Sequence, residues 1–284
     1  MKRSRNVETF LGCDNEYEEA KIVIFGAPYD STTSYRPGAR VASRTMRGES
    51  YGLETFSPYQ NKDLSEQAVY DAGDLELPFG SPVHALDQIE EFAAELHKDG
   101  KIPVMIGGEH LVTLPAVKAA FEANPDLHII HFDAHTDLRK EYLGETLSHS
   151  TVMRRVWEMV GDCRIFQFGI RSGEREEFEW GASHLYTNRY NLDGLPDVIK
   201  KLKGKPVYLT IDLDVLDPSV FPGTGTPEPG GVSFAQLHEA VVAVASRLHI
   251  VSADINELAP NYDPSGCSTA VACKILRELL LAMA

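Results

Sequence analysis

Hydrophobic residues gather along the chain in six short runs rich in Val and Ile, and longer stretches of helical period separate these runs. Runs of this length that are bounded by turn residues predict buried strands. We expect strands at residues 21–28, 101–108, 127–135, 163–170, 206–214 and 249–258. Because the runs are continuously apolar, they are typical of a parallel sheet that is covered on both faces.

The stretches between these runs predict amphipathic helices, because their apolar residues recur three or four positions apart. The clearest helix covers residues 81–100, with a Ser-Pro pair at its start, a glycine at its end and a stripe of Leu86, Ile89, Ala93 and Leu96. Further helices are expected at residues 113–123, 149–160, 233–248 and 268–283. The alternation indicates one α/β domain over residues 1–284, with helices on both faces of a mainly parallel sheet.

Composition narrows the classes of protein that fit this pattern. The chain has 284 residues, of which 43% are hydrophobic, and this is enough for a sizeable core. Acidic residues outnumber basic ones by 42 to 27, so the net charge is −15. Nucleic acids and anionic membrane surfaces both select basic patches, and this charge therefore argues against either partner.

Cysteine usage and the N-terminus favour a reduced, cytoplasmic protein. The four cysteines form no CxxC pair and no disulfide framework, although two disulfides remain an open alternative. The N-terminal sequence MKRSRNVETFLG is basic but lacks the apolar segment of a secretory signal. No apolar run approaches the roughly 20 residues that a membrane helix needs.

Ionisable side chains occur at every second position of the sequence HFDAHTD, where the strand expected at residues 127–135 ends. They are His131, Asp133, His135 and Asp137, and they would face one side of the sheet if the extended geometry continued. A buried carboxylate needs a proton, a cation or a metal beside it. We expect His131 to be a core histidine with one hydrogen bond rather than a ligand, because it lies deeper in the strand.

Two further strand ends carry groups that can bind metal: residues 107–110 read GGEH, and residues 210–214 read TIDLD. Ligands of parallel sheets collect at the carboxyl ends of the strands, so we expect the three ends to meet. The candidate metal ligands are His110, Asp133, His135, Asp137, Asp212 and Asp214. Without a thiolate, this set suits Mn²⁺ or a similar octahedral ion better than structural zinc, and four carboxylates would balance two divalent ions. The alternative is a polar network satisfied by hydrogen bonds alone.

These three segments resemble the ureohydrolases, the family of arginase, agmatinase and relatives that hydrolyse guanidino compounds to urea and an amine. The resemblance rests on GGEH, DAHTD and TIDLDVLDPSVFPGTGTPEPGG, and the early loop GAPYDSTTSYRPGAR is also similar. The segments follow the family order from about residue 24 to residue 260. The resemblance implies a three-layer α/β/α sandwich of the arginase type and assembly into homotrimers or homohexamers.

The resemblance also implies a binuclear centre with two Mn²⁺ ions per subunit. One ion would be bound by His110, Asp133, Asp137 and Asp212. The other would be bound by Asp133, His135, Asp212 and Asp214, so that two of the aspartates bridge the ions. A pair of divalent ions can activate a water molecule as a nucleophile near neutral pH.

Three residues are candidates for catalysis. Asp137, as a ligand beside the two ions, could accept a hydrogen bond from the nucleophile and ferry its proton. The resemblance further implies that Glu257 anchors the guanidinium by a carboxylate pair, with Asp254 as a candidate to orient it or to support the residues around it. His149 would pass a proton to the leaving amine, because an imidazole titrates near neutral pH. Taken without the family, Glu257 is a surface glutamate after a strand and His149 belongs to a helix-capping turn.

The loop LRKEYLGETLS, which follows DAHTD, favours agmatine as the small cationic substrate, with putrescine and urea as products. It lacks the Asn and Ser with which arginine-specific relatives hold an α-carboxylate, and it resembles the agmatinase version. Glu141 or Glu145 could attract the terminal amine of agmatine, whereas Arg139 or Lys140 could bind a guanidino acid such as guanidinobutyrate. Less favoured alternatives are a deacetylase of acetylpolyamines, which would need a His-His pair that this chain lacks, and a non-catalytic sensor.

Overall fold

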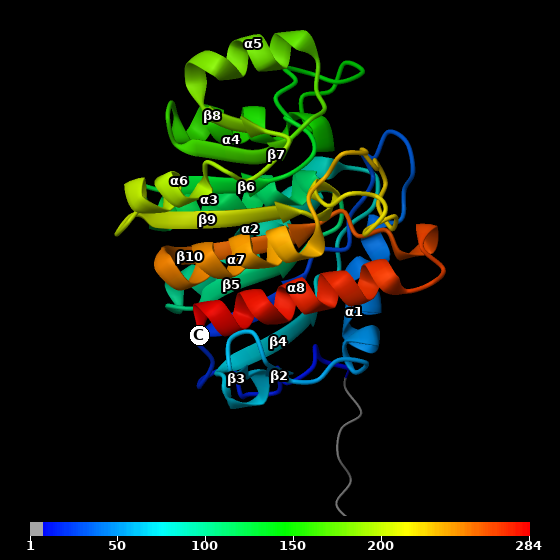
Figure 1. Cartoon of the computed structure of the whole chain (residues 1–284), viewed down its shortest axis with the longest axis vertical. Helices are drawn as coiled ribbons and strands as arrows, with labels where there is room; N and C mark the ends of the chain where they lie inside the picture. Colours follow the sequence, from blue (N-terminus) through cyan, green and yellow to red (C-terminus); the bar gives the residue numbers. More distant parts are fainter. Residues whose placement is uncertain (1–7) are drawn as a thin grey trace, which may run out of the picture.

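A computed structural model describes residues 8–284, and its centre is an eight-stranded sheet (Figure 1). Neighbouring strands follow the order β4-β1-β5-β10-β9-β6-β7-β8, and every pairing in this sheet is parallel. The strands are β1 (Ile22–Gly26), β4 (Val69–Asp74), β5 (Ile102–Ile106), β6 (His128–Phe132), β7 (Ile165–Ile170), β8 (Tyr186–Arg189), β9 (Pro206–Asp212) and β10 (His249–Asn256). The four strands β5, β10, β9 and β6 occupy the middle of the sheet.

Helices cover both faces of the sheet and form the outer layers. One face is covered by α1 (Ala42–Ser50), α6 (Leu195–Lys201), α7 (Phe234–Arg247) and α8 (Cys267–Met283), whose apolar residues share one buried core. The opposite face is covered by α2 (Pro82–Lys98), α3 (Thr113–Ala123) and α4 (Val152–Val160), which share a second core. In Figure 1, α7 and α8 lie in front of the strands, and α5 (Arg175–His184) lies beyond β8 at the top. The expected α/β/α sandwich is confirmed.

Alternation along the central strands explains why their sequences are apolar throughout. In β1, Ile22 and Ile24 pack in the first core, whereas Val23 and Phe25 pack in the second. Successive side chains of a strand point to opposite faces, and helices cover both faces here. The six strands and five helices predicted from the sequence are all present, and α2 buries the predicted stripe of Leu86, Ile89, Ala93 and Leu96.

The sequence did not predict the two edge strands, β4 and β8. Both are partly exposed and carry polar residues among few apolar ones, so they lack the apolar run that marks a strand covered on both faces. The short hairpin of β2 (Phe56–Ser57) and β3 (Lys62–Asp63) and the helices α1, α5 and α6 were also not predicted. These elements are short or polar, and their packing against the sheet decides them.

Three further expectations concern the cysteines, the N-terminal segment and membrane helices. The cysteines Cys13, Cys163, Cys267 and Cys273 are free, so the two disulfides left open by the sequence do not form. The basic residues at positions 1–7 lie outside the described residues. Within residues 8–284, no helix combines the length and the apolar character that a membrane crossing requires. The cytoplasmic location stays a prediction.

Candidate active site

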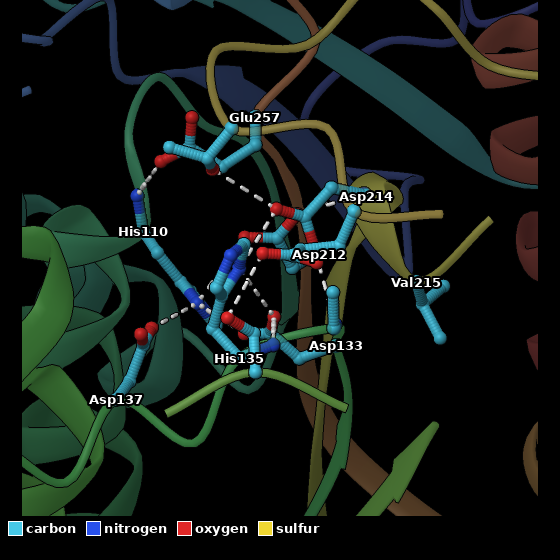
Figure 2. A network of polar contacts seen from close by, with 12 residues as sticks. His110, Asp133, His135, Asp137, Asp212, Asp214, Val215 and Glu257 are labelled. Carbon is cyan, nitrogen blue, oxygen red and sulfur yellow. Dashed lines mark hydrogen bonds and ion pairs between the residues drawn. The ribbon is translucent and has the colours of Figure 1, made fainter. Parts of the chain in front are cut away.

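The predicted metal ligands come from the carboxyl ends of three central strands. His110 follows β5, Asp133 follows β6, and Asp212 ends β9. Because these strands and β10 are neighbours in the sheet, their ends bring together residues that lie far apart in the sequence. Figure 2 shows the six candidate ligands around a common centre, with Glu257 beside it.

The segment HFDAHTD reaches this centre by a loop rather than by an extended strand. β6 ends at Phe132, and Asp137 adopts a left-handed backbone with φ of 52°. The premise that the strand geometry continues through Asp137 was therefore wrong. The side chains still converge, because the turn brings the Asp137 carboxylate to 3.0 Å from Nδ1 of His110. A left-handed aspartate is sparsely populated, and strained backbone of this kind occurs mainly at functional sites.

Asp133 lies at the middle of the cluster, and each of its carboxylate oxygens faces one of the two candidate ligand histidines. Its Oδ2 is 3.1 Å from Nδ1 of His110, and its Oδ1 is 3.5 Å from Nδ1 of His135. Asp212 Oδ2 lies 3.5 Å from the first of these imidazoles, and Asp214 Oδ2 lies 3.0 Å from the second. The cluster thus has two halves, each with an imidazole, and Asp133 is common to both.

Hydrogen bonds outside the cluster orient its imidazoles. Nε2 of His110 lies 2.9 Å from the hydroxyl of Thr210, so its Nδ1 faces the carboxylates. His131 also lies close enough to His110 and Asp133 to be a ligand. However, its Nε2 lies 2.7 Å from Asp133 Oδ2, and Gln167 donates a hydrogen bond of 3.1 Å to its Nδ1. His131 therefore has two hydrogen bonds, one more than expected, and it acts as an orienting partner of Asp133.

Burial and mutual repulsion set the charges of the aspartates. Burial raises the pKa of Asp212 well above its usual range, and the charges of Asp214 and other nearby carboxylates add to this effect. Burial acts in the same direction on Asp133, but its histidine neighbours, His131 first, outweigh it and hold the pKa of this carboxyl well below its usual range. Crowding of carboxylates at the centre thus disfavours the charged form of Asp212, and a cation beside it would reverse this effect.

The donor set fits two divalent cations. It consists of carboxylate oxygens and imidazole nitrogens, which suit Mn²⁺ and similar ions, and it lacks the thiolates of structural zinc sites. Four buried carboxylates repel one another, and two divalent ions would cancel their charge. Burial disfavours the charged form of His110, yet its carboxylate neighbours raise its pKa well above the usual range. The site is thus built to hold positive charge at its centre.

Glu257 lies where β10 ends and faces the same centre. Its backbone is left-handed, with φ of 65°, and its N–H donates a hydrogen bond of 2.9 Å to the Gly108 carbonyl. Its carboxylate accepts a hydrogen bond of 2.8 Å from the backbone N–H of His110. Burial raises its pKa well above the usual range, and the charge of Glu109 adds to this. A cationic guanidinium beside Glu257 would stabilise the charged form of this carboxylate.

Asp254 does not orient Glu257 directly. Within residues 8–284, its carboxylate accepts hydrogen bonds from Thr113, Tyr208 and Asn256, each between 2.6 and 2.8 Å. It is fully buried next to the strand ends. Asp254 therefore stabilises the packing of β9, β10 and α3 beneath the centre.

His149 opens a short 3-10 helix, His149–Thr151, that precedes α4. Its backbone N–H donates a hydrogen bond of 3.1 Å to the hydroxyl of Thr32, and its Nε2 lies 3.2 Å from the hydroxyl of Ser34. Burial lowers the pKa of its imidazole. His149 is also part of a helix-capping turn, because Ser148 and Thr151 form a capping box around it.

A cleft of about 250 Å³ opens over the centre and holds all three predicted catalytic residues, Asp137, His149 and Glu257. Glu141, Glu145 and Lys140 are exposed and lie outside the set of described residues that line this cleft. The loop supplies Arg139 and Tyr142 to its wall instead. Further lining residues that the sequence did not single out include Ser34, Ser172, Glu174 and Glu177.

Three of these missed residues follow β7 in the segment RSGEREEF. β7 is the neighbour of β6 in the sheet, so the rule that ligands collect at the carboxyl ends of parallel strands applies to it as well. At the cleft wall, Glu174 pairs with Arg139 at 3.0 Å. The Arg139 guanidinium also stacks over the ring of Tyr142, 4.7 Å from its centroid.

Comparison with known proteins gives consistent matches. The model of the Arginase family matches residues 20–282. An agmatinase of Bacillus anthracis is 48% identical over 278 residues, which are 96% of this chain and 96% of that protein. A solved structure from Clostridium difficile is 52% identical with a TM-score of 0.93, covering 94% of this chain and 98% of that one. The agmatine ureohydrolase of Thermoplasma volcanium is 33% identical with a TM-score of 0.90, covering 98% and 95%.

Proposed function

Because the chain belongs to the arginase family and is an agmatinase-like ureohydrolase, we propose that it hydrolyses agmatine to putrescine and urea with two Mn²⁺ ions. The observation that carries the proposal is the position of Asp133 between His110 and His135. Glu257 and His149 line the same cleft. Such a cleft can hold a cation, a nucleophile and a proton donor together.

Six residues would hold the two ions. His110 and Asp137 would bind one ion only, His135 and Asp214 the other, and Asp133 and Asp212 both. When bound, the ions lower the pKa of a water molecule so that a nucleophile forms near neutral pH. The remaining steps belong to the side chains of this chain.

The side chains of the cleft have separate roles toward the substrate: one binds the guanidinium and two transfer protons. The guanidinium carbon is a poor electrophile because its charge is shared by three nitrogens, so the group must be held firmly. Glu257 holds it through charge-assisted hydrogen bonds. Asp137 accepts the proton that the nucleophile loses. His149 gives a proton to the departing amine nitrogen, and the lowered pKa of its half-buried imidazole lets it release that proton more readily than an exposed one.

Charges at the cleft wall favour a substrate that ends in an amine. Agmatine carries an ammonium at the end opposite its guanidinium, and the cleft wall places two carboxylates, Glu174 and Glu177, beside the single guanidinium of Arg139, so that negative charge predominates there. A guanidino acid would instead need a free cation. Arg139 lines the cleft, but it is paired with Glu174 and stacked on Tyr142, so its charge is already engaged.

Glu174→Gln is expected to raise KM for agmatine by about 3- to 10-fold and to leave kcat within about twofold. The distal amine is bound equally before and during the reaction, so losing its partner weakens binding without changing the chemical step. The same change frees Arg139, and relative turnover of 4-guanidinobutyrate should rise. Steady-state urea release with both substrates measures these effects.

The control for this variant is Glu145→Gln, which removes a charge of the same kind from the exposed part of the 139–147 loop. Its KM should match the parent enzyme. An equal rise of KM in both variants would show that long-range charge, and not contact in the cleft, attracts the substrate.

Urea release from Mn²⁺-loaded protein tests the proposed function, with agmatine, arginine and 4-guanidinobutyrate assayed side by side. Turnover of agmatine above the other two is the expected result. Preference for a guanidino acid would keep the ureohydrolase and refute the substrate. Acetate from an acetylated polyamine would point to the deacetylase alternative, and no product from any of them would point to a sensor.

We also propose that the subunits assemble as a trimer or hexamer. The support for this is the resemblance to ureohydrolases, whose members commonly form such assemblies. Light scattering of the purified protein should give about three or six times the subunit mass of 31.4 kDa. A monomer at micromolar concentration would refute it.

A further inference from the structure

Glu109 is a fully buried carboxylate next to a predicted metal ligand, yet its hydrogen bonds go to a loop. Its two oxygens accept from the backbone N–H of Thr32 at 3.1 and 3.0 Å. The hydroxyl of Thr32 donates to Oε1 at 2.7 Å, and the hydroxyl of Thr33 donates to Oε2 at 2.9 Å. Charge-assisted hydrogen bonds of this kind fix the position of a loop firmly.

Thr32 and Thr33 belong to a loop, residues 30–38, whose two ends also make fixed contacts. Asp30 accepts a hydrogen bond of 2.8 Å from the backbone N–H of Gly38 and closes the loop. The Tyr262 hydroxyl donates to the Pro37 carbonyl at 2.9 Å, and the Arg36 guanidinium lies 3.9 Å from the centroid of the same ring. The loop is therefore a fixed wall against which other groups can be held.

Thr32 connects this wall to His149. A hydroxyl has one proton to donate and two lone pairs with which to accept. The Thr32 hydroxyl donates to Glu109 and accepts from the backbone N–H of His149 at 3.1 Å, so both contacts form at once. Because His149 is the first residue of its 3-10 helix, its N–H has no partner within the helix and depends on Thr32.

The His149 ring has few contacts of its own. Its buried Nδ1 has no hydrogen-bond partner among the described residues. Its Nε2 meets only the hydroxyl of Ser34 in the described part of the chain, and Ser34 belongs to the same loop. The ring also lies edge-on to Tyr142, with 6.1 Å between the ring centroids, but its polar contacts come from the loop, through Thr32 at the backbone and Ser34 at the ring.

We infer that Thr32 is a positioning residue, which transmits the fixed position of Glu109 to His149 and so aims the imidazole at the departing amine. This inference rests on the proposed function, because it takes the role of His149 from there. Among the described residues, Thr32 is not part of the cleft lining, and its side-chain hydrogen bonds go to Glu109 and His149 rather than to a candidate metal ligand. Its contribution lies in holding a proton donor within the narrow range of positions that the reaction allows.

Thr32→Val tests the inference, because it removes the hydroxyl and keeps the shape of the side chain. We expect kcat for agmatine to fall about 10- to 100-fold, since small misplacements of a catalytic group cost up to about 10²-fold. KM and the content of two Mn²⁺ per subunit should stay unchanged. Thr32→Ser, which restores the hydroxyl, should recover most of the turnover.

Thr33→Val is the matched control. It removes the neighbouring hydroxyl from the same carboxylate but breaks no contact with His149. Its kcat should fall by less than about threefold, as expected for a single loop hydrogen bond. Equal losses in the two variants, or a Thr32→Val enzyme within twofold of the parent, would overturn the inference.

A crystal structure of the Thr32→Val protein gives a readout independent of turnover. The His149 ring should be displaced from Ser34, and a ring in its original place would overturn the inference. If the parent enzyme hydrolyses a guanidino compound other than agmatine, the substrate proposal fails, and the variants are compared on that compound. If the parent hydrolyses none, the proposed function fails, and the crystal structure alone decides the positioning of His149.

Discussion

Asp133→Ala is expected to remove both metal ions and to lower turnover of agmatine by on the order of 10³-fold or more. Asp133 places one oxygen 3.1 Å from the imidazole of His110 and the other 3.5 Å from that of His135. Its loss therefore disrupts both halves of the centre. The ions contribute several kcal/mol to the reaction, and each 1.4 kcal/mol is worth about a factor of ten.

Metal analysis of the desalted variant, together with urea release, measures this effect. Asp137→Ala is the comparison, because within the cluster of described ligands Asp137 contacts the His110 half alone, and its loss should leave one ion per subunit. Two ions per subunit in the Asp133 variant would refute the assignment of the ligands. A single ion in the Asp133 variant would show that it does not bridge.

His149→Phe is expected to lower kcat by about 10²- to 10⁴-fold, which is the range that general acid catalysis contributes. Phenylalanine keeps a planar aromatic ring, slightly larger than the imidazole, but carries no proton to donate. The metal content should remain at two ions per subunit, because His149 lies outside the ligand cluster. Rapid-mixing or steady-state urea assays at saturating agmatine report kcat directly.

His184→Phe is a suitable control for the loss of a histidine. His184 lies on α5, and its Nδ1 pairs with Asp162 at 2.7 Å, outside the described lining of the cleft. Turnover of this control should stay within about twofold of the parent. A His149→Phe enzyme that retained full turnover would remove its acid role, and with it the basis for the effect of Thr32.

The sequence predicted the central sheet well because the central strands are buried on both faces. Their runs of Val and Ile leave few polar positions, and this pattern is legible without any knowledge of neighbours. The edge strands β4 and β8 could not be read in the same way, since their partial exposure permits polar residues. Pairing with β1 and β7, and not their own composition, makes them strands.

The candidate ligands could also be named from the sequence, because carboxylates crowded at the ends of buried strands are costly unless a cation lies among them. The backbone conformation that brings these side chains together could not be predicted. Asp137 arrives through a left-handed turn, and Glu257 does likewise, so neither follows the period of a strand. These conformations cost energy locally and exist because the surrounding structure imposes them.

By itself, the sequence determined the succession of central strands and helices along the chain, the apolar faces of the main helices, and the ligand types, since each depends on residues close in sequence. Only the tertiary structure decided which carboxylates beyond the predicted ligands and Glu257 line the cleft, Glu174 and Glu177 rather than Glu141 and Glu145. It also decided that Glu109 and Thr32 support His149. Contacts between residues more than seventy positions apart depend on how the strands are arranged in the sheet, and no local pattern encodes that arrangement.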